Sequence, residues 1–291
     1  MDRDGDLDIV SASSGDNTIA WYENDGAANP SWTASDISYT ALGPRGIFLA
    51  DIDSDGDLDI VSASSGDNTI AWYENDGAAN PSWTAADITT TANGARNVFV
   101  ADIDSDGDLD IVSASHDDDT IAWYENDGNS DPSFTKNVIS TSADGARGVH
   151  IADIDSDGDL DIVSASRIDN KIAWYENDGA NNPSWSTTTI ATSAAGARDI
   201  HIADMDNDGD LDIVSASSGD DTIAWYENDG AANPSWTATD IATTADGARD
   251  VYVSDLDNDG DLDIVSASTF DDTIAWYEND GAANPSWTAT D

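Results

Sequence analysis

Closely spaced aspartates are the residues of this chain best suited to do chemistry. Asp51–Ser64 reads DIDSDGDLDIVSAS, with aspartates at positions 1, 3, 5, 7 and 9 and a glycine at position 6. Alternate carboxylates around a tight turn can surround one hard cation, with oxygens at about 2.3–2.6 Å from Ca²⁺. The glycine permits the positive φ that reverses the chain. An EF-hand loop begins in the same way but is closed by a glutamate at position 12. This stretch has Ser62 there, so Asp59 must close the loop instead.

The aspartate loop recurs at a fixed interval. DGDLDIVSAS occurs six times, 51 residues apart, starting at Asp4, Asp55, Asp106, Asp157, Asp208 and Asp259. A solvated acidic turn is the alternative to a metal site. Without a bound cation, however, the carboxylates of such a loop would repel one another. Mg²⁺ is disfavoured because it keeps its waters and demands a tight octahedron. We therefore predict about one Ca²⁺ per repeat.

The elements that must position these loops are short strands. One period contains four runs rich in Ile, Val, Thr, Trp and Tyr, at residues 46–50, 58–64, 69–74 and 83–91, separated by Gly, Asn, Asp and Pro. No run has a helical apolar stripe. Four antiparallel strands in a repeat of roughly 40–50 residues are typical of a β-propeller blade. A parallel β-helix is the competing repeat fold, but its turns are usually shorter.

The predicted fold class is therefore all-β, a propeller of six four-stranded blades whose first blade lacks its innermost strand. We expect a single domain with blades at about 1–42, 43–93, 94–144, 145–195, 196–246 and 247–291. Six copies carry the second strand but only five carry the first, so the strand near Leu7–Ser13 has an unpaired edge. Unpaired edges invite pairing with another chain, so we expect self-association there.

Composition limits the partners. Lys and Arg number 9 against 60 Asp and Glu, a net charge of −51, which repels nucleic acid and anionic lipid and attracts cations. We expect no membrane insertion, because no apolar run approaches the ~20 residues that a bilayer requires. There is no cysteine, and Met1 is followed at once by the middle of a repeat. We expect a segment of a longer protein, whose missing signal peptide says nothing about secretion.

The motif D-x-D-x-D-G-x-x-D, leading into an apolar strand in each repeat, resembles the FG-GAP/VCBS calcium-binding β-propeller repeats, including those of integrin α-subunit heads. The Phe-Gly and Gly-Ala-Pro signatures are absent, which limits the integrin comparison to fold and metal. The resemblance implies that positions 1, 3, 5 and 9 bind Ca²⁺ through side chains and position 7 through its backbone carbonyl.

The resemblance thus implies five complete calcium sites. The implied side-chain ligands are Asp51, Asp53, Asp55, Asp59, Asp102, Asp104, Asp106, Asp110, Asp153, Asp155, Asp157, Asp161, Asp204, Asp206, Asp208, Asp212, Asp255, Asp257, Asp259 and Asp263. The implied carbonyl ligands are Asp57, Asp108, Asp159, Asp210 and Asp261. The first copy has Asp2, Asp4 and Asp8 with the Asp6 carbonyl but no position-1 aspartate, so its site is expected to be incomplete.

The differences between copies lie at the opposite end of the blades. The turn between the second and third strands reads SGDN, HDDD, RIDN, SGDD or TFDD, and the connection before each first strand carries an arginine. The candidate ligand-binding residues at this end are His116, Arg167, Ile168, Phe270, Arg96 and Arg147. The arginines form either an anion site or, as we favour, ion pairs with aspartates.

Aromatic columns have both packing and binding interpretations. Trp72, Trp83 and their equivalents are predicted to pack between blades, with sugar stacking as the alternative. His150 and His201 stand where other copies have Phe or Tyr, and are predicted to pack as well.

Three functions are compatible with these patterns. The favoured one is a non-catalytic, secreted or cell-surface module that recognises a glycan or protein ligand. The alternatives are a spacer within a large surface protein and the propeller part of a polysaccharide-degrading enzyme. Catalysis is disfavoured because the three histidines are scattered and no Ser/His/Asp or Cys/His arrangement occurs.

Overall fold

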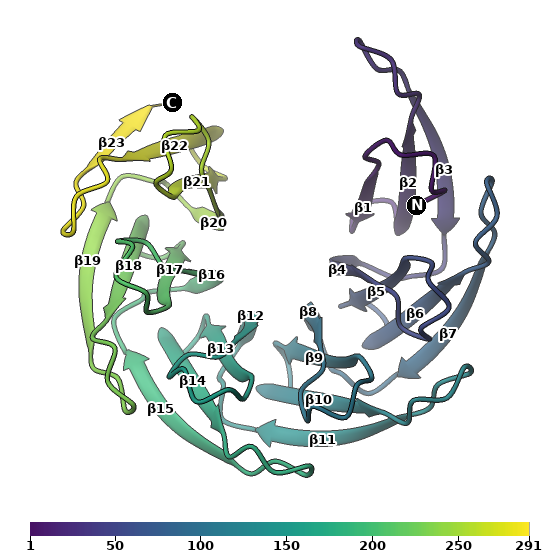
Figure 1. Ribbon diagram of the computed structural model, residues 1–291, viewed down its shortest axis with the longest axis horizontal. Coiled ribbons are helices and arrows are strands. Elements are labelled where there is room, and N and C mark those ends of the chain that lie inside the picture. Colours follow the sequence, from purple (N-terminus) through teal and green to yellow (C-terminus); the bar gives the residue numbers. More distant parts are fainter. Residues whose placement is uncertain (291) are drawn as a thin grey trace. The chain divides into compact units, whose positions relative to one another are not determined.

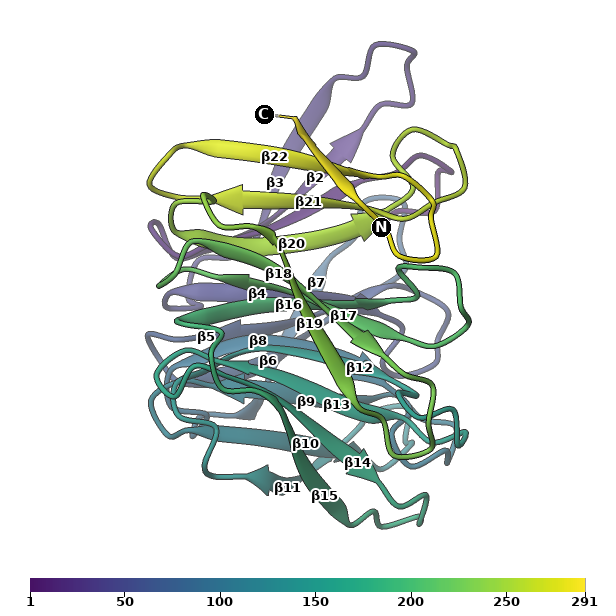
Figure 2. The same ribbon diagram turned by 90° about the vertical axis from the view of Figure 1, so that its left-hand side faces the viewer.

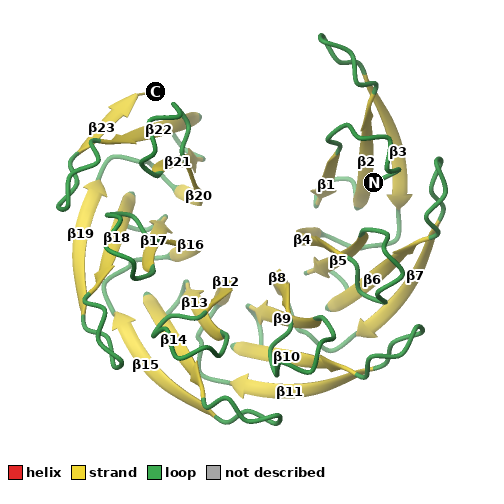
Figure 3. Ribbon diagram, viewed as in Figure 1, coloured by secondary structure: helices red, strands yellow, loops and turns green. Residues whose placement is uncertain are grey.

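The protein is described by a computed structural model covering residues 1–290. These residues form strands, turns and loops, and Figure 3 shows no helix among them. Accordingly, the described part of the chain has no helix of the length and hydrophobicity that crossing a membrane requires. The chain divides into two compact units, Met1–Ser142 and the residues from Ala143 onward.

The first unit contains three antiparallel sheets, called blades 1 to 3. Blade 1 has three strands, β1 (Ile9–Ser13), β2 (Thr18–Asn24) and β3 (Trp32–Ser38). Blade 2 consists of β4 (Pro44–Ala50), β5 (Asp59–Ser64), β6 (Thr69–Asn75) and β7 (Trp83–Thr89). Blade 3 consists of β8 (Ala95–Ala101), β9 (Asp110–Ser115), β10 (Thr120–Asn126) and β11 (Phe134–Ser140).

The second unit contains three further four-stranded sheets, blades 4 to 6. Blade 4 consists of β12 (Ala146–Ala152), β13 (Asp161–Ser166), β14 (Lys171–Asn177) and β15 (Trp185–Ala191). Blade 5 consists of β16 (Ala197–Ala203), β17 (Asp212–Ser217), β18 (Thr222–Asn228) and β19 (Trp236–Ala242). Blade 6 consists of β20 (Ala248–Ser254), β21 (Asp263–Ser268), β22 (Thr273–Asn279) and β23 (Trp287–Thr290).

The predicted fold class is confirmed: the chain is an all-β propeller of six blades, the first with three strands and the others with four. Strands follow chain order within each blade, so every connection inside a blade is a hairpin. Within a unit, the first strands of neighbouring blades lie side by side, as β4 and β8 do in one and β12, β16 and β20 in the other (Figure 1). Each sheet is strongly twisted, and in Figure 2 the last strand, β23, is steeply inclined to β20 and β21.

The core lies between blades, because both faces of each blade are apolar. We call the two faces the leading and the trailing face. On blade 3 the leading face consists of Leu109, Ile111, Tyr124 and Phe134, and on blade 2 the trailing face consists of Val61, Ala63, Ile70 and Trp72; these residues form one cluster. The same pairing of faces recurs between blades 1 and 2, 4 and 5, and 5 and 6. A strand with two apolar faces is thus explained by a neighbouring sheet on each side.

Candidate metal centres and the opposite face

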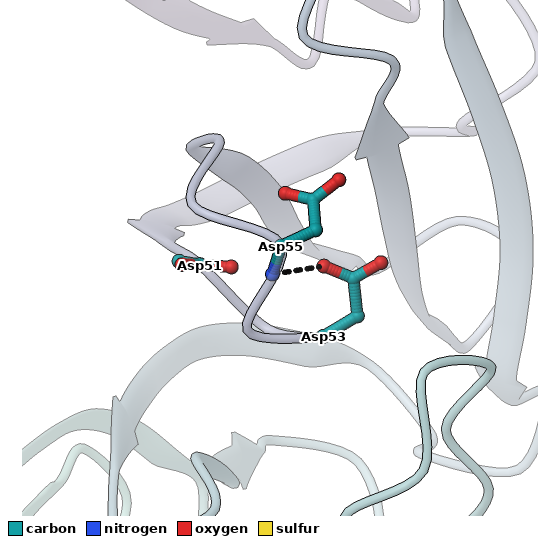
Figure 4. A group of neighbouring side chains, drawn as sticks. All are labelled: Asp51, Asp53 and Asp55. Carbon is teal, nitrogen blue, oxygen red and sulfur yellow. Dashed lines mark hydrogen bonds between the residues drawn. The ribbon is translucent and has the colours of Figure 1, made fainter.

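Each aspartate loop joins the first and second strands of a blade, and the backbone holds its carboxylates in place. In the loop between β4 and β5, Ser54 has φ of 59° and Gly56 has φ of 93°, which turn the chain back on itself. The Gly56 amide donates to Asp51 Oδ2 at 2.9 Å. The Asp55 amide donates to Asp53 Oδ1 at 3.3 Å, as drawn in Figure 4. These bonds hold the carboxylates of Asp51 and Asp53 in place. The Asp57 amide holds that of Asp55 by donating to its Oδ1 at 2.8 Å.

Five loops each bring three carboxylates together, with one oxygen of each within 4.8 Å of the others. The clusters are Asp51, Asp53 and Asp55; Asp102, Asp104 and Asp110; Asp153, Asp155 and Asp157; Asp204, Asp206 and Asp212; and Asp255, Asp257 and Asp259. Positions 1 and 3 are present in every cluster, completed by position 5 in three loops and by position 9 in two. These aspartate clusters could hold metal ions.

The clustered carboxylates repel one another. Burial raises the pKa of Asp53, and the neighbouring charges of Asp55 and Asp51 raise it further. The pKa of Asp104 is raised by the same kinds of cause, burial first and then Asp106. A group whose charged form is disfavoured by burial and by like charges is stabilised when a cation enters the cluster.

Three loops contain a carboxylate oxygen that is buried and without a hydrogen-bond partner among the described residues. These atoms are Asp51 Oδ1, Asp155 Oδ1 and Asp255 Oδ1. A buried oxygen that accepts no hydrogen bond is costly, so such atoms call for a ligand. All-oxygen, all-carboxylate surroundings suit a hard divalent cation, and the residues present therefore fit Ca²⁺.

The position-9 aspartate also has a structural task. Asp59 is only 1% exposed and accepts hydrogen bonds from the Asn75 amide at 2.8 Å and the Ile52 amide at 3.2 Å. Burial raises the pKa of Asp59 to about 6, and that of its equivalents Asp110, Asp161 and Asp212 to about 7. This carboxylate thus joins the loop to the end of the third strand.

The sequence did not predict the role of the asparagine that ends the third strand of each four-stranded blade. Asn126, at the end of β10, donates to the Leu109 carbonyl at 3.0 Å and to the Ile52 carbonyl at 3.2 Å. Ile52 belongs to the loop of the preceding blade, so Asn126 ties two consecutive aspartate loops together. Asn228 and Asn279 make the equivalent pairs of bonds in the second unit. The available signal was the invariant final asparagine of the TIAWYEN and KIAWYEN segments.

The position-7 side chains lie outside the clusters. Asp108 packs against Gly128, filling the space that a Cβ at Gly128 would occupy. Asp57, Asp159, Asp210 and Asp261 pack in the same way against the glycines of their own blades. Only the backbone of position 7 is thus left for a cation, the role that the family resemblance implies.

The first loop differs from the other five. The Met1 ammonium group donates to Asp8 Oδ2 at 2.9 Å, where the other loops have a backbone amide. The Arg3 guanidinium pairs with Asp57 Oδ1 at 2.7 Å and also contacts the Gly56 carbonyl of the next loop. Asp2, Asp4 and Asp8 do not form one of the three-carboxylate clusters found among residues 1–290. Asp6 packs against Gly26, as its equivalents do in their own blades.

The varied turns lie at the other end of the blades, bound to the connections between blades. The Arg167 amide donates to the Gly145 carbonyl at 3.0 Å and the Ile168 amide to the Asp144 carbonyl at 3.0 Å. The backbone amides of His116 and Phe270 make equivalent hydrogen bonds to the carbonyls of Gly94 and Asp246. Ile168 and Phe270 lie over the connection glycines and remain exposed, while His116 Nδ1 contacts Asp117 Oδ1 at 2.7 Å.

The arginines lie beside these turns. Arg45 Nε donates to Ser65 Oγ at 3.0 Å, and Arg249 makes the corresponding contact with Thr269. Arg96 and Arg147 are half-buried at the same position of their blades. Of the six predicted ligand-binding residues, Arg167, Ile168 and Phe270 are therefore the exposed ones.

The first strands carry a column of ring contacts. The centroids of His150 and His201 are 5.2 Å apart, and those of His201 and Tyr252 are 4.9 Å apart. Burial, and then the neighbouring His201, lower the pKa of His150 to about 4. A neutral histidine in tilted contact with another ring behaves as a packing residue, as predicted.

Comparisons with known proteins agree with this geometry. The FG-GAP-like repeat family matches residues 1–62, 51–113, 102–164, 154–215 and 204–266, which confirms the resemblance seen in the loops. No curated protein sequence matches the chain. Among solved structures, the crystal structure of the V. cholerae biofilm matrix protein Bap1 aligns with a TM-score of 0.50 and 18% identity. The alignment covers 85% of this chain but only 41% of that one, and at this identity it shows a shared fold.

Proposed function

Since this chain belongs to the FG-GAP-like repeat family, we propose that it is a calcium-stabilised, non-catalytic recognition module that acts outside the cell. The observation that carries the proposal is the buried, unpartnered carboxylate oxygen in the loops of Asp51, Asp155 and Asp255. Such an oxygen lacks a hydrogen-bond partner among the described residues of its loop. It is the group that a bound cation would satisfy.

Calcium is the proposed ion because the loops offer several carboxylates and a backbone carbonyl around a flexible turn. Ca²⁺ accepts about 6–8 oxygens at varied geometry, whereas Mg²⁺ demands six in an octahedron. The proposed ligands in blade 2 are the side chains of Asp51, Asp53, Asp55 and Asp59 and the carbonyl of Asp57. Bound Ca²⁺ would supply positive charge that holds the carboxylates together, and the chain's own contribution is the preformed turn.

An extracellular location is supported by two features. Loops of this kind bind Ca²⁺ where its concentration is high, as it is outside cells. The fold is shared with a protein described as a biofilm matrix protein. The large negative charge of the chain also suits a soluble surface that calcium partly neutralises.

Recognition of a glycan or protein ligand is assigned to the varied turns. The calcium loops are nearly uniform, whereas the exposed Arg167, Ile168 and Phe270 differ from blade to blade. A charged group beside exposed apolar side chains can hold an amphipathic ligand. The three histidines support a non-catalytic module, because His116 lies in a turn while His150 and His201 are stacked between strands.

A glycan array, complemented by a screen of matrix proteins, tests the assignment. Replacing Arg167 and Ile168 by Ser and Gly, the residues of the equivalent turn at Ser218 and Gly219, should abolish binding while stability changes by less than ~0.5 kcal/mol. A ligand that still binds this variant, or that is found only beside the calcium loops, would contradict the assignment.

A spacer is the second candidate function, and the near identity of the blades favours it. Three of the six turns keep the same SGD sequence, which a binding face has no reason to do. The spacer predicts no hit on either screen. The same result would leave the propeller part of a polysaccharide-degrading enzyme as a further candidate.

A further inference from the structure

A relay of hydrogen bonds connects the aspartate loops of adjacent blades. In the second unit, Ile154 lies between Asp153 and Asp155, two of the clustered carboxylates of the blade-4 loop. The Ile154 carbonyl accepts a hydrogen bond at 3.1 Å from Nδ2 of Asn228, which ends β18 in blade 5. The backbone amide of Asn228 donates at 2.8 Å to Oδ1 of Asp212, a clustered carboxylate of the blade-5 loop. Two hydrogen bonds through one asparagine thus connect the two clusters.

The same relay recurs at two further contacts between blades. The asparagine, the carbonyl and the carboxylate that take part are those of Asn126, Ile52 and Asp110 between blades 2 and 3, and of Asn279, Met205 and Asp263 between blades 5 and 6. Asp212 also accepts the Met205 amide at 3.1 Å. Blades 4, 5 and 6 are therefore joined by one continuous series of hydrogen bonds.

The asparagine side chain has no freedom to take up a movement of either loop. Asn228 is 2% exposed, and its Nδ2 donates both to the Ile154 carbonyl and to the Leu211 carbonyl, each at 3.1 Å. Its Oδ1 accepts the Gly230 amide at 3.1 Å. Ile154 and Asp212 are as deeply buried, so water has little access to replace these bonds if a loop shifts. A displacement of one loop is therefore passed to the next.

We propose that the asparagine ending the third strand of a four-stranded blade is a positioning residue that couples the calcium sites of adjacent blades, so that filling one site raises the affinity of the next. The inference rests on the proposed calcium binding. A loop whose carboxylates are drawn together fixes its position-2 carbonyl, and with it the asparagine and the position-9 carboxylate of the next loop. That loop then has less conformational freedom to lose on binding, which produces positive cooperativity. The coupling is reciprocal between the two sites.

Electrostatics alone would give coupling of the opposite sign. Two divalent cations in neighbouring loops repel, so filling one loop would weaken binding in the next. Emptying the blade-4 loop should therefore weaken the blade-5 site if the relay dominates, and strengthen it if repulsion dominates.

The experiment follows hydrogen exchange of the whole chain by mass spectrometry during titration with Ca²⁺. Peptides of the blade-5 loop are resolved because Met205 gives them a mass that differs from those of the other loops. Calcium should protect the amides of this loop in the wild-type chain. Asp155→Asn, which removes a proposed ligand from the blade-4 loop, should raise the Ca²⁺ midpoint of the blade-5 loop by about fivefold or more, as is typical of coupled sites.

The matched control is Asp159→Asn. It removes the same charge from the same loop, but at a side chain that packs against Gly179 outside the cluster. The blade-5 midpoint should be nearly unchanged in this variant. An equal shift in both variants would overturn the relay, because it would follow from the charge alone.

Asn228→Ala gives the decisive comparison. In this background Asp155→Asn should no longer change the blade-5 midpoint, a loss that a purely structural role of Asn228 would not produce. Asn228→Ser, whose side chain is too short to reach both carbonyls, takes its place if circular dichroism shows that Asn228→Ala does not fold.

The outcomes separate this inference from the calcium proposal. A wild-type blade-5 loop that calcium does not protect would overturn the calcium proposal and the coupling with it. Protection with a midpoint that is the same or lower in Asp155→Asn would overturn the coupling alone. So would a shift that persists when Asn228 is replaced.

Discussion

Replacing a clustered aspartate by asparagine should have opposite effects with and without calcium. Asp104 lies in the cluster with Asp102 and Asp110, and burial and Asp106 raise its pKa. Asp104→Asn keeps the shape of the side chain but removes its charge. Without calcium this removes repulsion and should stabilise the protein. With calcium it removes a ligand and should destabilise it.

The magnitude follows from the linkage between binding and folding. A site that binds only the folded chain contributes about 2.7 kcal/mol when the free ion is at a hundred times its Kd. If Asp104→Asn empties that one site, the loss corresponds to a fall in Tm of about 5–10 °C, at about 2–4 °C per kcal/mol for a unit of this size. In chelator the Tm should rise by a few degrees, because only the repulsion is removed.

The assay is thermal unfolding of wild type and variant in saturating calcium and in excess chelator. Asp108→Asn is the matched control, since it removes the same charge from the same loop but at a side chain that packs against Gly128 outside the cluster. In saturating calcium, Asp108→Asn should lower the Tm much less than Asp104→Asn does. A Tm for Asp104→Asn that changes in the same direction in both buffers would refute the reasoning.

Two further predictions concern residues outside the loops. Asp199 accepts the Val251 amide at 3.2 Å, and burial and then Asp250 raise its pKa to about 7. The folded chain therefore holds this proton more tightly than the unfolded chain, so the contribution of Asp199 to stability is lost as pH rises through about 7. Asp199→Asn, which copies Asn97 of blade 3, should raise Tm at pH ~8 more than at pH ~5.5, and an equal shift at both would contradict this. Ile70→Ala should cost about 2–5 kcal/mol in chemical denaturation, because Ile70 is fully buried between blades. A cost below ~0.5 kcal/mol, as at an exposed position, would contradict the assignment of the faces.

The repeat made most of the fold predictable from the sequence. A strand such as Thr69–Asn75 has apolar residues on both faces, which only a sheet packed between two sheets explains. The predicted runs at 46–50 and 83–91 differ from β4 and β7 by two residues at one end. The bulge between Pro44 and Gly46 extends the first strand toward the turn, which local propensity does not reveal.

The sites were predictable in outline but not in the details that depend on neighbouring blades. The spacing of aspartates predicted that carboxylates gather in each loop, since the ligands lie within nine residues of chain, but not whether position 5 or position 9 is the third member of the cluster. It could not show that Asn126 joins consecutive loops, because its partner at Ile52 is 74 residues away. Nor could it show Arg3 reaching Asp57, or the raised pKa of Asp199, because both effects arise between two blades.

The most direct test of the account is the number of calcium ions that the folded chain binds. Chelator-stripped protein, titrated with Ca²⁺ in a calorimeter and weighed by native mass spectrometry, should bind five ions per chain, one for each three-carboxylate cluster. The same titration should raise Tm by well over ~10 °C, since each filled site stabilises only the folded state. A chain that binds no calcium at millimolar concentration, and whose Tm is the same in chelator, would contradict the account.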